Sequence, residues 1–204
     1  LIHGPQEGHF EFGGKTGTHD VERYLETAAE EGLYVLARPG PYQYSELQHD
    51  GLPRWLCEGF PELHAHNLAG NVFRASSISY LHPLFLEKVE RWFAEVCPRL
   101  ARWTVSKGGP VAFTQFDNEL GGIHRWFGSL DYNAKTLGLG EPTGRFPRFL
   151  KDRYQEIGRL NALYGTTFPD FASVVPLAAP PAPGLADARR MKDFFHFYQG
   201  MLAE

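Results

Sequence analysis

Cysteine is scarce in this chain of 204 residues, which contains only Cys57 and Cys97. Two cysteines cannot form a disulfide framework, and these two stand in no spacing that is typical of metal ligands. Long apolar runs are missing as well, since none approaches the twenty or so residues that a membrane-spanning helix requires. The sequence therefore predicts neither a disulfide-stapled protein nor a membrane protein, and it leaves the cellular compartment open.

An excess of positive charge is also absent. The net charge is -4, and the lysines and arginines are scattered along the chain rather than gathered on one predicted face. This distribution gives no electrostatic footprint for nucleic acid, so no nucleic-acid partner is expected. The histidines His64, His66, His49, His82 and His124 have no carboxylate or cysteine at ligand spacing, so neither a metal nor another cofactor is expected.

The first half of the chain alternates helical and strand-like patterns. Residues 18–31 predict an amphipathic helix with Thr18 as N-cap and Gly32 as its end, and the apolar run 33–37 predicts a strand covered on both faces. Residues 83–105 and 110–116 repeat the pair of a helix followed by a buried strand. This repeat predicts an α/β fold in which the two strands are parallel neighbours.

The second half is predicted to be mainly helical. One helix is expected over residues 146–163, ended by Gly165, and a stiff connector over 176–184. A last helix is expected from residue 186 to the C-terminus, and its predicted inward-facing residues are Met191, Phe194, Phe195, Tyr198 and Leu202.

Polar side chains follow both predicted strands. The first strand runs into "RPGPYQYSE", and the second ends in "FTQFDNELGG", where an amide and two carboxylates follow an apolar run. The carboxyl ends of parallel strands open onto a shared mouth, so we expect Glu46 and Glu119 to meet there. Asp117 points to the opposite strand face from Asn118, which favours a structural pairing for it.

Four blocks of residues resemble a known family, in its order and at similar spacing. "GHFEFGG", "AAEEGLYVLARPGPYQYSE", "GLPRWL" and "GGPVAFTQFDNELGG" are similar to the motifs of glycoside hydrolase family 35, the β-galactosidases. The resemblance covers residues 1 to about 122. Further along, "RFLKDRYQEIGRLNALYGTTF" is also similar to a segment of the family 42 β-galactosidases.

The resemblance implies a fold and a set of roles. The fold is a partial (β/α)8 TIM barrel, from the end of strand 2 to about helix 4 and a following insertion. Residues 1–204 then form one partial catalytic domain, with a motif-bearing core at 1–122, an insertion and connector at 123–184 and a helix at 185–204. Glu119 takes the place of the acid/base of a retaining hydrolase, and Asn118 that of the amide that contacts the sugar 2-hydroxyl.

The loop after the first predicted strand takes the place of the family's galactose-recognition loop. Glu46 matches the family there, whereas Tyr44 and Ser45 depart from it and leave the exact sugar open. Structural roles remain alternatives: Glu119 as a helix cap or the partner of an arginine, and Glu46 as a salt-bridge residue at the loop rim.

The family's nucleophile, a glutamate at the end of strand seven, has no counterpart among these 204 residues. We therefore expect a piece of a longer glycosidase that supplies the acid/base half of the site and acts on a β-galactoside or a related oligosaccharide. The alternative is a catalytically inactive fragment that binds sugar, associates with itself or pairs with the remainder of the barrel.

Overall fold

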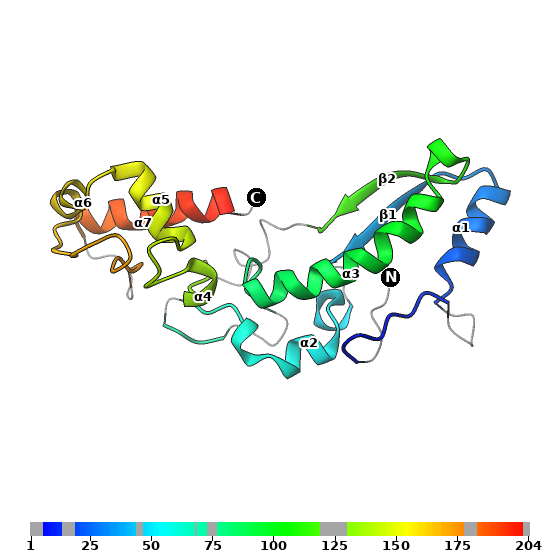
Figure 1. Cartoon of the computed structure of the whole chain (residues 1–204), viewed down its shortest axis with the longest axis horizontal. Coiled ribbons are helices and arrows are strands. Elements are labelled where there is room, and N and C mark those ends of the chain that lie inside the picture. Colours follow the sequence, from blue (N-terminus) through cyan, green and yellow to red (C-terminus); the bar gives the residue numbers. More distant parts are fainter. Residues whose placement is uncertain are drawn as a thin grey trace. The chain divides into compact units, whose positions relative to one another are not determined.

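The computed structural model describes residues 6–13, 19–43, 47–67, 69–72, 77–118, 130–177 and 183–201 (Figure 1). The chain divides into two compact units, which we treat separately. Unit 1 comprises Leu1–Leu63 and Leu84–Leu120, and unit 2 comprises His64–Pro83 and Gly121–Glu204. No helix within these described ranges combines the length and apolarity that crossing a membrane would need.

Unit 1 is built on two strands, β1 (Val35–Gly40) and β2 (Val111–Phe116), which pair in parallel. Their pairing confirms the prediction that the two strands are neighbours. The connection between them includes the long helix α3 (Pro83–Arg102), and α1 (Val21–Glu30) precedes β1. The shorter elements are η1 (Gln48–Gly51), α2 (Arg54–Gly59), η2 (Pro61–Leu63) and η3 (Val105–Lys107).

Helix α1 begins later than its sequence pattern predicted. Asp20, not Thr18, is the N-cap, because its carboxylate accepts the backbone N–H of Arg23 at 2.9 Å. That bond satisfies one of the donors left unpaired in the first turn of a helix. The predicted end is confirmed, since Gly32 follows the helix with a φ of +68° and donates its N–H to the Ala29 carbonyl.

The prediction of strands buried on both faces is wrong for the described part of the chain. One face is covered by α3, but Leu36 and Phe113, which pair across the sheet, are 52% and 73% exposed. Strand β1 also starts two residues later than predicted and runs on through Pro39 to Gly40. Proline is tolerated there because Pro39 lies in the irregularity of the strand register between Ala37 and Gly40, and proline within sheets is found at bulges.

Trp92 anchors α3 to the covered face of the sheet. Its ring is 1% exposed and stacks on Phe12 with 5.5 Å between ring centroids. Its indole N–H donates to the Pro39 carbonyl at 2.8 Å, which satisfies the one polar group of a buried ring. The surrounding core contains Leu25, Ala37, Val96, Leu100 and Val111. This packing places the carboxyl end of β1 relative to α3.

Unit 2 is helical, with α4 (Ala134–Leu137), α5 (Arg145–Tyr154), α6 (Ile157–Tyr164) and α7 (Leu185–Met201). The single helix predicted over 146–163 is two helices, because Gln155 has a φ of +66° and ends α5. Gly165 ends α6, as predicted.

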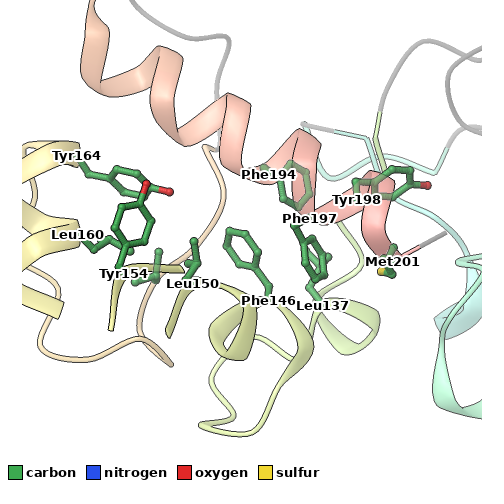
Figure 2. Packing of buried hydrophobic residues seen from close by; sticks show 11 residues of the cluster. Leu137, Phe146, Leu150, Tyr154, Leu160, Tyr164, Phe194, Phe197, Tyr198 and Met201 are labelled. Carbon is green, nitrogen blue, oxygen red and sulfur yellow. The ribbon is translucent and has the colours of Figure 1, made fainter. Parts of the chain in front are cut away.

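Figure 2 shows the core between these helices, in which Phe194 and Phe197 of α7 lie against Phe146 of α5. Phe194 and Tyr198 are buried, as predicted. Phe195, which was expected to face inward, is instead 40% exposed, and Phe197 takes the buried place on the helix. The predicted Leu202 lies outside the described residues.

Two buried carboxylates hold unit 2 together. Asp131 accepts the backbone N–H groups of His66 and Asn133 and the hydroxyl of Ser79, so it joins the 64–83 segment to the start of α4. Asp193 of α7 is 2% exposed and accepts the hydroxyl groups of Tyr154 and Tyr164. Each carboxylate thus has several hydrogen-bond donors, as burial of a charge requires.

Candidate functional site

The carboxyl ends of β1 and β2 are joined by Asp117. Its backbone N–H donates to the Gly40 carbonyl at 3.1 Å, and its carboxylate Oδ1 accepts the Tyr42 N–H at 3.0 Å. Asp117 thereby bonds to the residues that end one strand and begin the loop after it. The expected structural role for Asp117 agrees with these contacts.

Asp117 has a φ of +59°, which is uncommon for a residue other than glycine but is enriched in Asp and Asn. This left-handed residue ends β2 and turns the chain before Asn118. The side-chain amide of Gln115 spans the turn, because its Nε2 donates to the Asp117 carbonyl at 3.0 Å and to Asn118 Oδ1 at 3.1 Å. Asn118 is half-buried and is held within this network.

Asn118 is the one predicted site residue that the structure describes. Tyr44, Ser45, Glu46 and Glu119 lie outside the described residues, so the meeting of Glu46 and Glu119 stays a prediction. The residues next to them in sequence are described: Tyr42 and Gln43 directly precede the predicted recognition loop, and Asn118 directly precedes Glu119. The bond from Tyr42 to Asp117 therefore brings together the approaches to both predicted loops.

Sequence reasoning missed Gln115. The pattern of the strand gave no reason to separate this glutamine from other polar residues at a strand end. The signal that was available is its position two residues before Asp117, because a side chain of that length reaches the turn that follows the strand.

Other chemistry is limited in the described part of the chain. Burial, followed by the charges of Asp50 and Glu58, raises the pKa of Cys57 to about 12, so its thiol stays protonated and is not a nucleophile near neutral pH. Within the residues that the structure covers, no three His, Cys, Asp or Glu side chains are grouped so as to hold a metal ion.

A small cavity of about 30 Å³ lies in unit 1 beside Pro41. Its lining includes Trp55, Phe85 and Lys88. A space of this size holds about one water molecule, so it does not accommodate a sugar ring.

Comparison with known proteins identifies the class of protein. The model of glycosyl hydrolases family 35 matches residues 1–137, and the chain belongs to this family. Its relatives include an exo-beta-D-glucosaminidase of Pyrococcus horikoshii, which is 34% identical over 99% of this chain. Beta-galactosidase of Mus musculus is 36% identical over 59% of it. The chain spans 26% of the length of the first relative and 16% of that of the second.

The fold is shared with a solved beta-galactosidase from the haloarchaeon Halorubrum lacusprofundi. The two superpose with a TM-score of 0.72 at 20% sequence identity, over 98% of this chain and 27% of that one. The likeness extends over both helical and strand-containing parts of the chain, and it confirms a fold that mixes helices and strands.

Replacing Asp117 tests its structural role. Asp117→Ala removes the bond to Tyr42. It also leaves an alanine, which has no polar side chain, in a backbone conformation with positive φ. We expect it to lower the free energy of unfolding by about 1 to 3 kcal/mol in urea titrations. Asp117→Asn keeps an acceptor and tolerates the backbone conformation, so it should cost about 0.5 kcal/mol or less. Equal losses for the two variants would contradict the role assigned to the carboxylate.

Proposed function

We propose that the chain is part of the catalytic (β/α)8 barrel of a retaining β-galactosidase-like glycoside hydrolase. The observation that carries the proposal is the joining of the two strand ends by Asp117, beside the residue predicted to contact the sugar. Membership of family 35 supports it, and so does the exposed sheet face with Leu36 and Phe113, which suits the interior of a barrel completed by further strands.

In this proposal Glu119 is the acid/base and Asn118 contacts the sugar 2-hydroxyl. A retaining glycosidase places its acid and its nucleophile about 5 to 5.5 Å apart, and the acid protonates the leaving oxygen before acting as base. The nucleophile lies outside these residues. Glu46, Ser45 and Tyr44 bind the substrate, a β-galactoside or related oligosaccharide.

A second candidate is an exo-acting hydrolase of β-glucosaminides. It is favoured by the Pyrococcus horikoshii relative, because that protein matches 99% of this chain whereas the mouse beta-galactosidase matches 59%.

A third candidate is a catalytically inactive fragment that binds sugar or associates with itself or with the remainder of the barrel. Among the described residues the sheet has two strands, and outer edges without a described neighbour favour such association.

The test is hydrolysis of 4-nitrophenyl β-galactoside and β-glucosaminide by residues 1–204 alone and by the longer polypeptide that contains them. We expect turnover by the longer polypeptide and none by residues 1–204, since double displacement needs the second carboxylate. Turnover by a monomeric 204-residue protein that is lost in Glu46→Gln would show that Glu46 is the nucleophile and would overturn the fragment proposal. Absence of turnover by both proteins would favour the inactive candidate.

A further inference from the structure

We propose that Gln115 is a positioning residue that fixes the orientation of the Asn118 amide, and so selects sugars that carry a hydroxyl rather than an ammonium at carbon 2. The inference rests on the proposed function, because that function brings Asn118 to the sugar. It goes further by naming the group that orients Asn118 and the substrate class that this orientation admits.

The orientation of both amides follows from which groups can donate. Gln115 Nε2 lies 3.0 Å from the Asp117 carbonyl oxygen, which can only accept a hydrogen bond. The end of the Gln115 side chain at that oxygen must therefore be the NH2 group. The same NH2 lies 3.1 Å from the Asn118 side chain, so the Asn118 atom facing it must be the oxygen Oδ1.

The acceptor that sets this orientation is itself held in place. Asp117 is bonded through its N–H to Gly40 and through its carboxylate to Tyr42, so its carbonyl cannot turn without breaking the connection between the strand ends. Gln115 belongs to β2, whose backbone is paired with β1. The Asn118 amide is thus fixed by a strand residue and a strand-end turn, which is the rigid support that a recognition group needs.

The consequence is chemical. Because Oδ1 is turned toward Gln115, the opposite end of the amide, which a ligand on the far side from Gln115 would meet, is Nδ2, which only donates. A sugar 2-hydroxyl has lone pairs that accept such a bond, and the bond to this hydroxyl strengthens in the transition state of a glycosidase. A 2-ammonium group has three donors and no acceptor, so it would face Nδ2 donor to donor. The arrangement therefore favours 2-hydroxy sugars over 2-amino sugars.

The experiment uses three substrates with the longer polypeptide: 4-nitrophenyl β-galactoside, its 2-deoxy analogue and its 2-amino-2-deoxy analogue. We expect the unmodified protein to have a kcat/KM at least about 10-fold higher for the 2-hydroxy than for the 2-amino substrate. Gln115→Glu replaces the donor by an acceptor, which lets the Asn118 amide turn over. It should lower kcat/KM for the 2-hydroxy substrate by about 10-fold to 100-fold, the size expected for one misdirected hydrogen bond.

The 2-deoxy substrate separates positioning from general damage, since it has no group for Asn118 to contact. The kcat/KM of Gln115→Glu for this substrate should change by less than about 3-fold, which is less than the loss of one hydrogen bond would cause. Gln115→Met, which removes the donor without adding charge, should show the same pattern with a smaller effect. Gln199→Glu makes the same chemical change at an exposed position of α7 and should leave all three values unchanged.

Equal losses on all three substrates would show that Gln115 is only structural. Preference of the unmodified protein for the 2-amino substrate would overturn the assigned selectivity.

If none of the three substrates is hydrolysed, the proposed function fails. Nuclear magnetic resonance titration of the Asn118 side-chain amide then decides the inference separately. A larger shift with galactose than with galactosamine supports it. The reverse order, or no shift with either sugar, overturns it.

Discussion

Glu119→Gln is expected to lower turnover of β-galactosides with poor leaving groups by about 100-fold to 10,000-fold, the contribution typical of general acid-base catalysis. The substitution keeps the shape of the side chain and removes the group that gives and takes the proton. In the proposed mechanism that proton goes to the leaving oxygen, so the loss should appear in kcat as well as in kcat/KM. Steady-state kinetics of the longer polypeptide on an unactivated disaccharide measures it.

The leaving group provides the internal comparison. Aryl galactosides with a nitro-substituted phenol need little protonation, so their glycosylation step should suffer much less than that of the disaccharide. Glu95→Gln, at an exposed position of α3, serves as the matched control and should leave turnover unchanged. Equal loss on both kinds of substrate would indicate that Glu119 acts as a helix cap or ion-pair partner instead of as the acid.

Asp193→Ala is expected to lower the free energy of unfolding of unit 2 by about 3 to 5 kcal/mol, the range seen when one member of a buried charged network is removed. Three partners lose their acceptor: the hydroxyls of Tyr154 and Tyr164, and Arg153, whose Nε lies 2.9 Å from Asp193 Oδ1. The first two are on α5 and α6, so the change loosens α7 from both. Urea unfolding followed by tyrosine fluorescence measures the loss.

The cost should come from the hydroxyl bonds more than from the ion pair, because the Arg153 side chain is 40% exposed and is screened by water. Asp193→Asn retains an acceptor oxygen and should therefore cost clearly less than Asp193→Ala. Asp152→Ala, at an exposed position of α5, should change stability by about 0.5 kcal/mol or less. A loss of that small size for Asp193→Ala would contradict the role given to the cluster.

The same cluster should weaken the fold at alkaline pH. Burial, and then the hydrogen bond to Asp193 and its charge, raise the pKa values of Tyr154 and Tyr164 in the folded state. Below the unfolded tyrosine pKa of about 10 both states are protonated and stability is complete. As the pH rises above that value the unfolded state loses protons that the folded state keeps, so the free energy of unfolding falls. Chemical unfolding at pH 8 and pH 11 measures this decline.

Local patterns predicted the elements of unit 1 well and their surroundings poorly. The apolar runs at 33–37 and 110–116 mark β1 and β2, and the spacing of α3 is visible in its buried Phe85, Trp92, Val96 and Leu100. A continuous apolar run does not reveal what lies on each side of a strand. Leu36 and Phe113 therefore read as buried although they are exposed in the described chain.

Helix boundaries depended on contacts that a sequence window does not contain. Asp20 and Thr18 are both good N-caps, and the choice of Asp20 follows from where the chain enters the helix next to Phe12, whose carbonyl accepts the Val21 N–H. The break at Gln155 follows neither Gly nor Pro. The left-handed conformation of that residue is compatible with α5 and α6 both packing against α7, which supplies much of the shared core.

Sequence alone was sufficient for the helix–strand alternation, the parallel pairing of the two strands and the order of motifs that matches family 35, because these depend on residue types at fixed short spacings. The tertiary structure decided which partners the polar residues have. The contacts from Asp117 to Gly40 and Tyr42 join residues about 75 apart in sequence. Those from Asp193 to Tyr154 and Tyr164 join three helices. A buried polar group must find a partner wherever the fold brings one, and no local pattern records which residue that is.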